Sequence, residues 1–203
     1  MHRIYSAIIE TIAAAVFIIP LCCIYNILRL HSAKRTVIYT VFGLYLTALL
    51  ALVGFPGVTS LKIDFEVNII PIFNMVSDFN MVSDFTNACL NILLFVPFGF
   101  FLPILWDNFR KIKSVALAGL FAALFIEISQ IFTFRTTDIN DIVTNTVGAV
   151  VGYSIARLIT NRFTKQVCLK CKMCDFYLIC GTVVVVMFFF QPFISSLLWN
   201  MVL

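Results

Sequence analysis

The residues whose types can carry chemistry gather in one short stretch of the sequence. This stretch contains carboxylates, side-chain amides and one guanidinium: Glu127, Gln130, Arg135, Asp138, Asp141 and Asn145. An arginine guanidinium can hold a phosphate or carboxylate bidentately, and a carboxylate in apolar surroundings can act as a general base. The stretch therefore suggests either binding of an anionic or multiply hydroxylated headgroup, or acid–base chemistry on such a group.

Helical spacing places the first two of these groups on one face. Glu127 and Gln130 are three residues apart near the end of an apolar run over about 114–132, which predicts a helix. With a rise of about 1.5 Å per residue, Glu127 lies roughly 8 Å inside the end of that run at Phe132. A carboxylate at that depth in a membrane is costly, so we interpret Glu127 as functional.

Two further predicted helices bring polar groups to the same end. The helix over about 142–160 carries a stripe about 60° wide of polar and then small residues: Asp141, Asn145, Gly148 and Gly152. The helix over about 87–105 starts with Asn87 and Asn91 on one face. Gly148 and Gly152 are expected to allow close helix packing, and the polar groups of the three helices are expected to form one site.

Each of these residues also has a simpler structural interpretation. Asp138 and Asp141 can be the N-cap and a first-turn acid of the helix that follows. Arg135 can offset the dipole at the end of the preceding helix. The amides can be interhelical hydrogen-bonding groups: Asn91, Gln130 and Asn145. Neither capping nor hydration explains Glu127 in this way.

The composition of the chain requires a membrane. Hydrophobic residues make up 62% and charged residues 12% of 203 residues, and the mean hydropathy is +1.04. Six apolar runs are long enough to cross a bilayer, at about 5–28, 37–55, 87–105, 114–132, 142–160 and 176–199. The first run resembles a secretory signal, but it is long and its basic residues mostly follow it. The sequence predicts an all-α, polytopic membrane helical bundle of about six transmembrane helices.

The distribution of basic residues predicts the orientation of these helices. Of the 14 Lys and Arg residues, 11 lie around the first, third and fifth predicted loops, and only Arg3, Lys62 and Arg135 lie on the other side. Loops rich in Lys and Arg stay in the cytoplasm, so both termini are expected outside the cell membrane. The basic rim suggests anionic lipids as neighbours, and we expect no nucleic-acid partner.

Two further sequence features are a cluster of cysteines and a tandem hexapeptide repeat. Cys168, Cys171 and Cys174 have the spacing of half a zinc site, but no histidine lies near them to complete it. We therefore expect no metal and no cofactor, and interpret the cysteines as reduced thiols. A hexapeptide at 74–79 recurs at 80–85 in the long external loop, and we interpret it as a tolerated local duplication.

The polar stretches resemble the VanZ-like family, which is named for a teicoplanin-resistance membrane protein. The matching segments are Asn91-Ile-Leu-Leu-Phe-Val-Pro-Phe-Gly99, Glu127-Ile-Ser-Gln130 and the run from Arg135 through Asp141, Asn145 and Gly148 to Gly152. They extend over about 69–153, preceded by Asn68-Ile-Ile-Pro71. We expect an extra span and loop over 1–36, a VanZ-like core over 37–160, and a Cys-bearing loop and last span over 161–203.

The resemblance implies a small bacterial integral membrane protein of the cell envelope, linked in some members to low-level resistance to teicoplanin-type lipoglycopeptides. Our leading hypothesis is a non-enzymatic or weakly enzymatic envelope protein that recognises a lipid-linked headgroup, such as that of an envelope precursor, or a lipoglycopeptide at the outer leaflet. The rival hypothesis is an outer-leaflet hydrolase or transferase of a lipid phosphate or envelope ester, with Glu127 as base and Arg135 stabilising negative charge. A flippase ranks third, because the polar stripe does not continue towards the cytoplasm.

The predicted orientation can be tested with single cysteines placed at Thr136 and Asn108 in a Cys-free background. Because these positions lie on opposite sides of the predicted membrane, a membrane-impermeant thiol reagent on intact cells should label the Thr136 variant and leave the Asn108 variant unlabelled. Labelling after the membrane is opened is the control. The reverse pattern would place the polar site in the cytoplasm.

Overall fold

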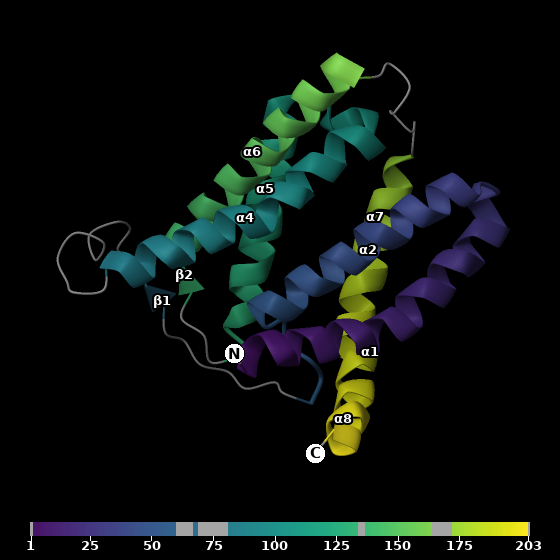
Figure 1. Cartoon of the computed structure of the whole chain (residues 1–203), viewed down its shortest axis with the longest axis vertical. Coiled ribbons are helices and arrows are strands. Elements are labelled where there is room, and N and C mark those ends of the chain that lie inside the picture. Colours follow the sequence, from purple (N-terminus) through teal and green to yellow (C-terminus); the bar gives the residue numbers. More distant parts are fainter. Residues whose placement is uncertain (1, 60–66, 69–80, 134–136, 164–171, 203) are drawn as a thin grey trace. The chain divides into compact units, whose positions relative to one another are not determined.

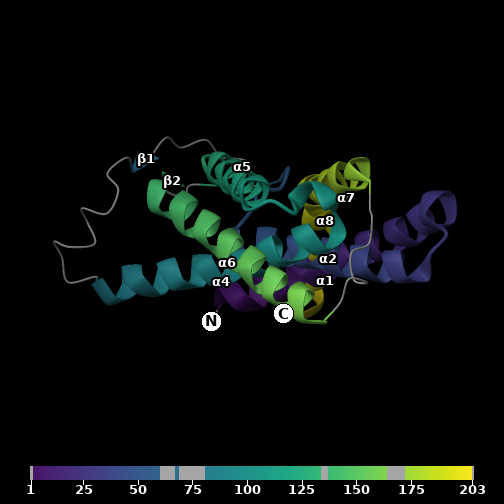
Figure 2. The same ribbon diagram turned by 90° about the horizontal axis from the view of Figure 1, so that it is seen from above.

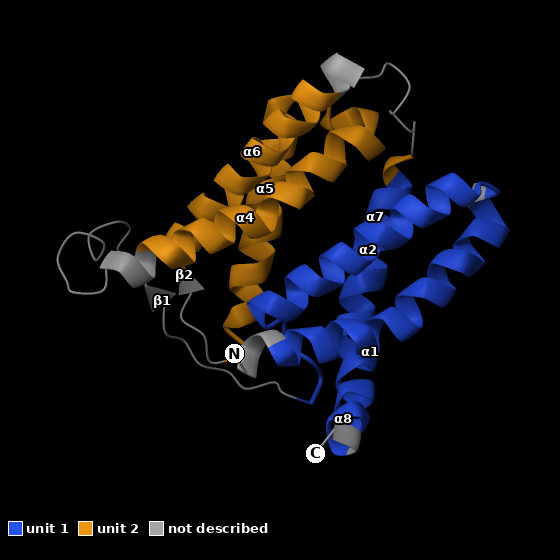
Figure 3. Ribbon diagram, viewed as in Figure 1, with its two compact units in different colours: residues 1–62, 174–203 blue, residues 63–173 orange. Residues whose placement is uncertain are grey.

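The computed structural model describes residues 2–59, 67–68, 81–133, 137–163 and 172–202 (Figure 1). Contacts divide the chain into two compact units, coloured separately in Figure 3. Unit 1 comprises Met1–Lys62 and Cys174–Leu203, and unit 2 comprises Ile63–Met173. Every residue of the predicted polar site belongs to unit 2.

The described residues of unit 2 form three helices and a minimal strand pair. Its elements in chain order are β1 (Val67–Asn68), α4 (Met81–Leu105), the 3₁₀ turn η2 (Asp107–Phe109), α5 (Ile112–Gln130), β2 (Thr137–Asp138) and α6 (Ile139–Phe163). Helix α6 packs most extensively on α4 and also lies against α5 (Figure 2). The two strands pair in parallel, with Val67 opposite Thr137 and Asn68 opposite Asp138.

The described part of unit 1 contributes three candidate membrane spans, Tyr5–Arg29, Ala33–Val53 and Met173–Asn200. Its elements are α1 (His2–Tyr25) with the π-helical turn η1 (Asn26–Leu30), α2 (Ala33–Val53), α7 (Met173–Val185), the π-helical turn η3 (Val186–Phe190) and α8 (Gln191–Val202). Helix α1 packs against α2 and α8. The last span is continuous from α7 through η3 to α8.

The expected all-α membrane fold is confirmed. Among the described residues, six helices are long and apolar enough to cross a membrane, at Tyr5–Arg29, Ala33–Val53, Phe85–Leu105, Ile112–Gln130, Ile139–Ile159 and Met173–Asn200. Their surfaces agree with this environment, because large apolar side chains such as Leu93, Phe121 and Leu158 are about two-thirds exposed in unit 2. Such surface is stable against lipid and would be unfavourable in water.

The observed helices begin a few residues before the apolar runs that predicted them. Helix α2 starts at Ala33, so Lys34 and Arg35 lie in its first turn instead of in a loop. Helix α6 starts at Ile139, three residues before the apolar run, because polar residues at a helix start extend the helix beyond its hydrophobic part.

Some predicted features fall outside the described residues. These features are the first hexapeptide copy, Arg135, Cys168 and Cys171. Cys174 is described and exposed. Within the described ranges, no three His, Cys, Asp or Glu side chains lie close enough to hold a metal ion.

Glycines allow α6 to approach its neighbours in unit 2. A Cβ built on Gly148 would collide with the carbonyl oxygen of Ile92, and one on Gly152 would collide with the carbonyl oxygen of Val96. Both obstacles are backbone atoms of α4, which cannot move unless the helices separate. The two glycines therefore set the contact between α4 and α6, as their spacing predicted.

Replacing Gly152 by Ala should lower the stability of the protein, whereas Gly181→Ala should not. The added methyl at position 152 meets α4 backbone, and overpacking of this kind costs about 1–3 kcal/mol. Nothing lies within 4 Å of the corresponding position on Gly181 in α7, where Ala improves helix propensity. Thermal unfolding of both variants in detergent measures the difference, and equal midpoints would contradict the packing account.

Candidate functional site

Glu127 joins the end of α5 to the start of α6. Its side chain is only 2% exposed, and its Oε2 accepts a hydrogen bond of 3.0 Å from the backbone N–H of Asp138. Because ionised carboxylates favour N–H donors at a helix start, this bond fixes where the chain enters α6. The structure therefore gives the buried carboxylate a definite positioning role, which the sequence did not predict.

Asp138 is the N-cap of α6. Its Oδ1 accepts a hydrogen bond of 2.9 Å from the backbone N–H of Asn140, the second residue of the helix. This is the geometry of an N-cap, so the capping interpretation of Asp138 is confirmed. Asp141 lies in the first turn of the same helix, where a negative charge interacts favourably with the helix dipole.

Asn91 links α4 to the start of α6. Its Nδ2 donates a hydrogen bond of 2.8 Å to Oδ1 of Asp141, and both side chains are half-buried. Together with the bond from Asp138 to Glu127, this contact brings polar groups of α4, α5 and α6 to one end of unit 2. The structure thus brings these four predicted residues into two linked pairs.

Asn145 is the most unusual residue of the group. It lies one helical turn after Asp141, on the face of α6 that continues to Gly148, and it is only 3% exposed. Its Oδ1 has no hydrogen-bond partner. An interhelical hydrogen bond was expected there, so that interpretation fails for this oxygen.

Gln130 and Arg135 complete the predicted set. Gln130 is buried in the last turn of α5, one turn after Glu127, and its backbone oxygen accepts hydrogen bonds from Thr133. Arg135 lies outside the described residues, between α5 and β2. Its place in the site remains a prediction.

The sequence did not predict the strand that reaches this end of unit 2. Asn68 of β1 lies opposite Asp138 of β2, so a segment of the long loop is held beside the N-cap of α6. A two-residue strand has no detectable periodicity. The only signal was the segment Asn68-Ile-Ile-Pro71, which matched the family resemblance.

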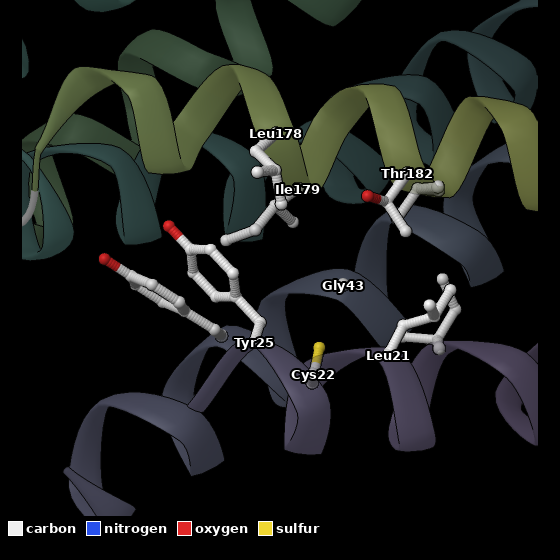
Figure 4. Close-up of a pocket in the computed structure, with 10 residues that line it drawn as sticks. Leu21, Cys22, Tyr25, Gly43, Leu178, Ile179 and Thr182 are labelled. Carbon is white, nitrogen blue, oxygen red and sulfur yellow. The ribbon is translucent and has the colours of Figure 1, made fainter. Parts of the chain in front are cut away.

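A second buried carboxylate was missed, in unit 1. Asp175 of α7 is 5% exposed and accepts hydrogen bonds from the hydroxyls of Tyr25 (2.5 Å) and Tyr39 (3.0 Å), which belong to α1 and α2. Tyr25 also lines a cavity of about 30 Å³ whose other lining side chains are mostly apolar; Figure 4 shows Tyr25 among these side chains. The three helices are therefore tied together around one carboxylate. A charged residue at the edge of the last apolar run was the available signal.

Comparison with known proteins decides the family. The sequence pattern of the VanZ/LLP1 family matches residues 17–160, well over half of the chain. The chain belongs to the VanZ/LLP1 family. The match includes every predicted site residue of unit 2 and begins within α1, further toward the N-terminus than the motifs alone. Asp175 lies beyond it.

The chain is also similar to a curated protein that shares the family name. The chain is 32% identical to Protein VanZ of Enterococcus faecium over 76 residues, which are 37% of this chain. The match spans 47% of that relative, about half of its length. No solved structure matches this VanZ/LLP1 chain. The division into segments 1–36, 37–160 and 161–203 remains a prediction.

Proposed function

We propose that this VanZ/LLP1 protein recognises, at the outer leaflet of the cell membrane, the polar headgroup of a lipid-linked envelope precursor or of a lipoglycopeptide. The single observation that carries the proposal is the meeting of polar groups from three apolar helices at one end of unit 2. Capping explains Asp138 and the dipole favours Asp141, but neither explains a buried Glu127 or an unpartnered Asn145 oxygen.

The surroundings of the site support an amphiphilic ligand. Below the polar end, α4, α5 and α6 expose large apolar side chains such as Leu93, Phe121 and Val147. A lipid tail can lie against such helix surface while its headgroup meets the polar end. Lipid-linked precursors and lipoglycopeptides share this combination, and resistance to teicoplanin-type drugs is what the family resemblance implies.

The hydrogen bond of Glu127 favours recognition over catalysis. Its Oε2 accepts the backbone N–H of Asp138, so this oxygen takes part in holding the start of α6. A general base must instead direct a lone pair to the proton that it removes. We therefore retain binding as the function and treat hydrolysis or group transfer as an outcome that the test must detect.

Resistance should depend on Glu127 and Arg135. In a susceptible host that expresses the chain, Glu127→Gln keeps an acceptor for the Asp138 N–H but removes the charge, and Arg135→Ala removes the guanidinium. Both variants should reduce the inhibitory concentration of teicoplanin to the level of the empty vector.

A matched control is Asp107→Asn, because Asp107 is a half-exposed carboxylate in the turn between α4 and α5 that pairs with Arg110 at 3.0 Å. This variant should retain resistance, and membrane abundance of all variants should equal that of the wild type. Full resistance in both site variants would contradict the proposal. An altered envelope lipid that requires Glu127, detected by mass spectrometry, would favour the enzyme instead.

A further inference from the structure

We propose that the group recognised at this site is a hydrogen-bond donor, the hydroxyl of a lipid-linked sugar, and that Oδ1 of Asn145 accepts its hydrogen bond. The inference rests on the proposed function and specifies its ligand. It starts from the one described residue of the polar end whose buried side-chain oxygen has no partner.

The position of Asn145 makes its unpartnered oxygen informative. The residue is six positions after the start of α6 at Ile139, so it lies about 9 Å along the helix axis. At 3% exposure it does not reach solvent, and a buried acceptor without a partner carries the full cost of its desolvation. A ligand that supplies an O–H or N–H donor would recover this cost.

The neighbouring side chains determine whether the partner donates or accepts hydrogen bonds, and which charge it carries. The polar end carries the carboxylates of Glu127, Asp138 and Asp141, and ionised carboxylates only accept hydrogen bonds. Each of them accepts a hydrogen bond from an N–H group. A phosphate would add further acceptors and negative charge beside three carboxylates. A neutral, hydroxyl-rich group complements the same surface.

Close packing restricts the direction from which this group enters. One turn beyond Asn145, Gly148 lies against the backbone of Ile92, and Gly152 lies against that of Val96 a turn later. Backbone contact leaves no room for a headgroup between α4 and α6 at these positions. The ligand therefore enters from the Asp141 end and stops at Asn145. A transporter would need a path that continues beyond this point, so the geometry fits recognition.

Binding of defined lipids to the full chain tests the inference. Native mass spectrometry or a tryptophan-quenching titration in nanodiscs would compare four dioleoyl lipids: glucosyl diacylglycerol, phosphatidylethanolamine, phosphatidic acid and phosphatidylcholine. The glucosyl lipid offers hydroxyl donors without charge, whereas phosphatidylcholine offers no donor. Glucosyl diacylglycerol should bind at least tenfold more tightly than either phosphatidic acid or phosphatidylcholine. Preferred binding of phosphatidylethanolamine would overturn the hydroxyl assignment in favour of an ammonium.

The variant Asn145→Leu separates ligand binding from structural support. Leu has the same branched shape and number of side-chain heavy atoms as Asn and removes the unpartnered oxygen, so the melting temperature of the lipid-free protein should rise while affinity for the glucosyl lipid falls about tenfold. Asn108→Leu is the matched control, because Asn108 is an exposed amide in the turn between α4 and α5, away from the polar end, and it should change neither value. A lower melting temperature for Asn145→Leu, or unchanged affinity, would overturn the role of Asn145.

The two proposals fail in distinguishable ways. If phosphatidic acid binds best and Glu127→Gln abolishes its binding, the site recognises a headgroup but the donor inference is wrong. If none of the three other lipids exceeds phosphatidylcholine, the proposed recognition of lipid headgroups fails together with the inference.

Discussion

The backbone contact between α4 and α6 is the constraint on which the rest of unit 2 depends. Gly148 and Gly152 present no side chain to α4, so the backbones meet at the carbonyl groups of Ile92 and Val96. This contact sets the register of the two helices. In that register, Nδ2 of Asn91 donates a hydrogen bond of 2.8 Å to Oδ1 of Asp141. In a lipid environment, close packing and interhelical hydrogen bonds replace the hydrophobic effect as the forces that hold helices together.

Local hydrogen bonds then determine how the third helix joins this pair. Glu127 accepts the N–H of Asp138, and Asp138 caps α6 through the N–H of Asn140. One carboxylate thus connects α5 to the turn, and the next carboxylate starts α6. Among the described residues, the Oδ1 of Asn145 is the buried side-chain atom that lacks a partner, and this is why we assign it to the proposed ligand.

The sequence was sufficient where a physical rule acts along one helix. Apolar length predicted the six spans, helical spacing predicted that Asn145 and Gly148 share a face, and Asp138 had the type and position of an N-cap. It was insufficient where contacts join distant segments. The pairing of Asn68 with Asp138, and the two tyrosines around Asp175, depend on tertiary packing that no local pattern encodes.

The central claim, that the polar end of unit 2 meets the headgroup of a lipid-linked ligand, is most directly tested by photocrosslinking in intact cells. A benzoylphenylalanine at Asn87, one turn before Asn91 on α4, would report on this end, and one at the exposed Leu117 of α5 would report on lipid elsewhere along the bundle. The account predicts a sugar-bearing lipid adduct, identified by mass spectrometry, at Asn87 and not at Leu117. The same glycerophospholipids at both positions would contradict it.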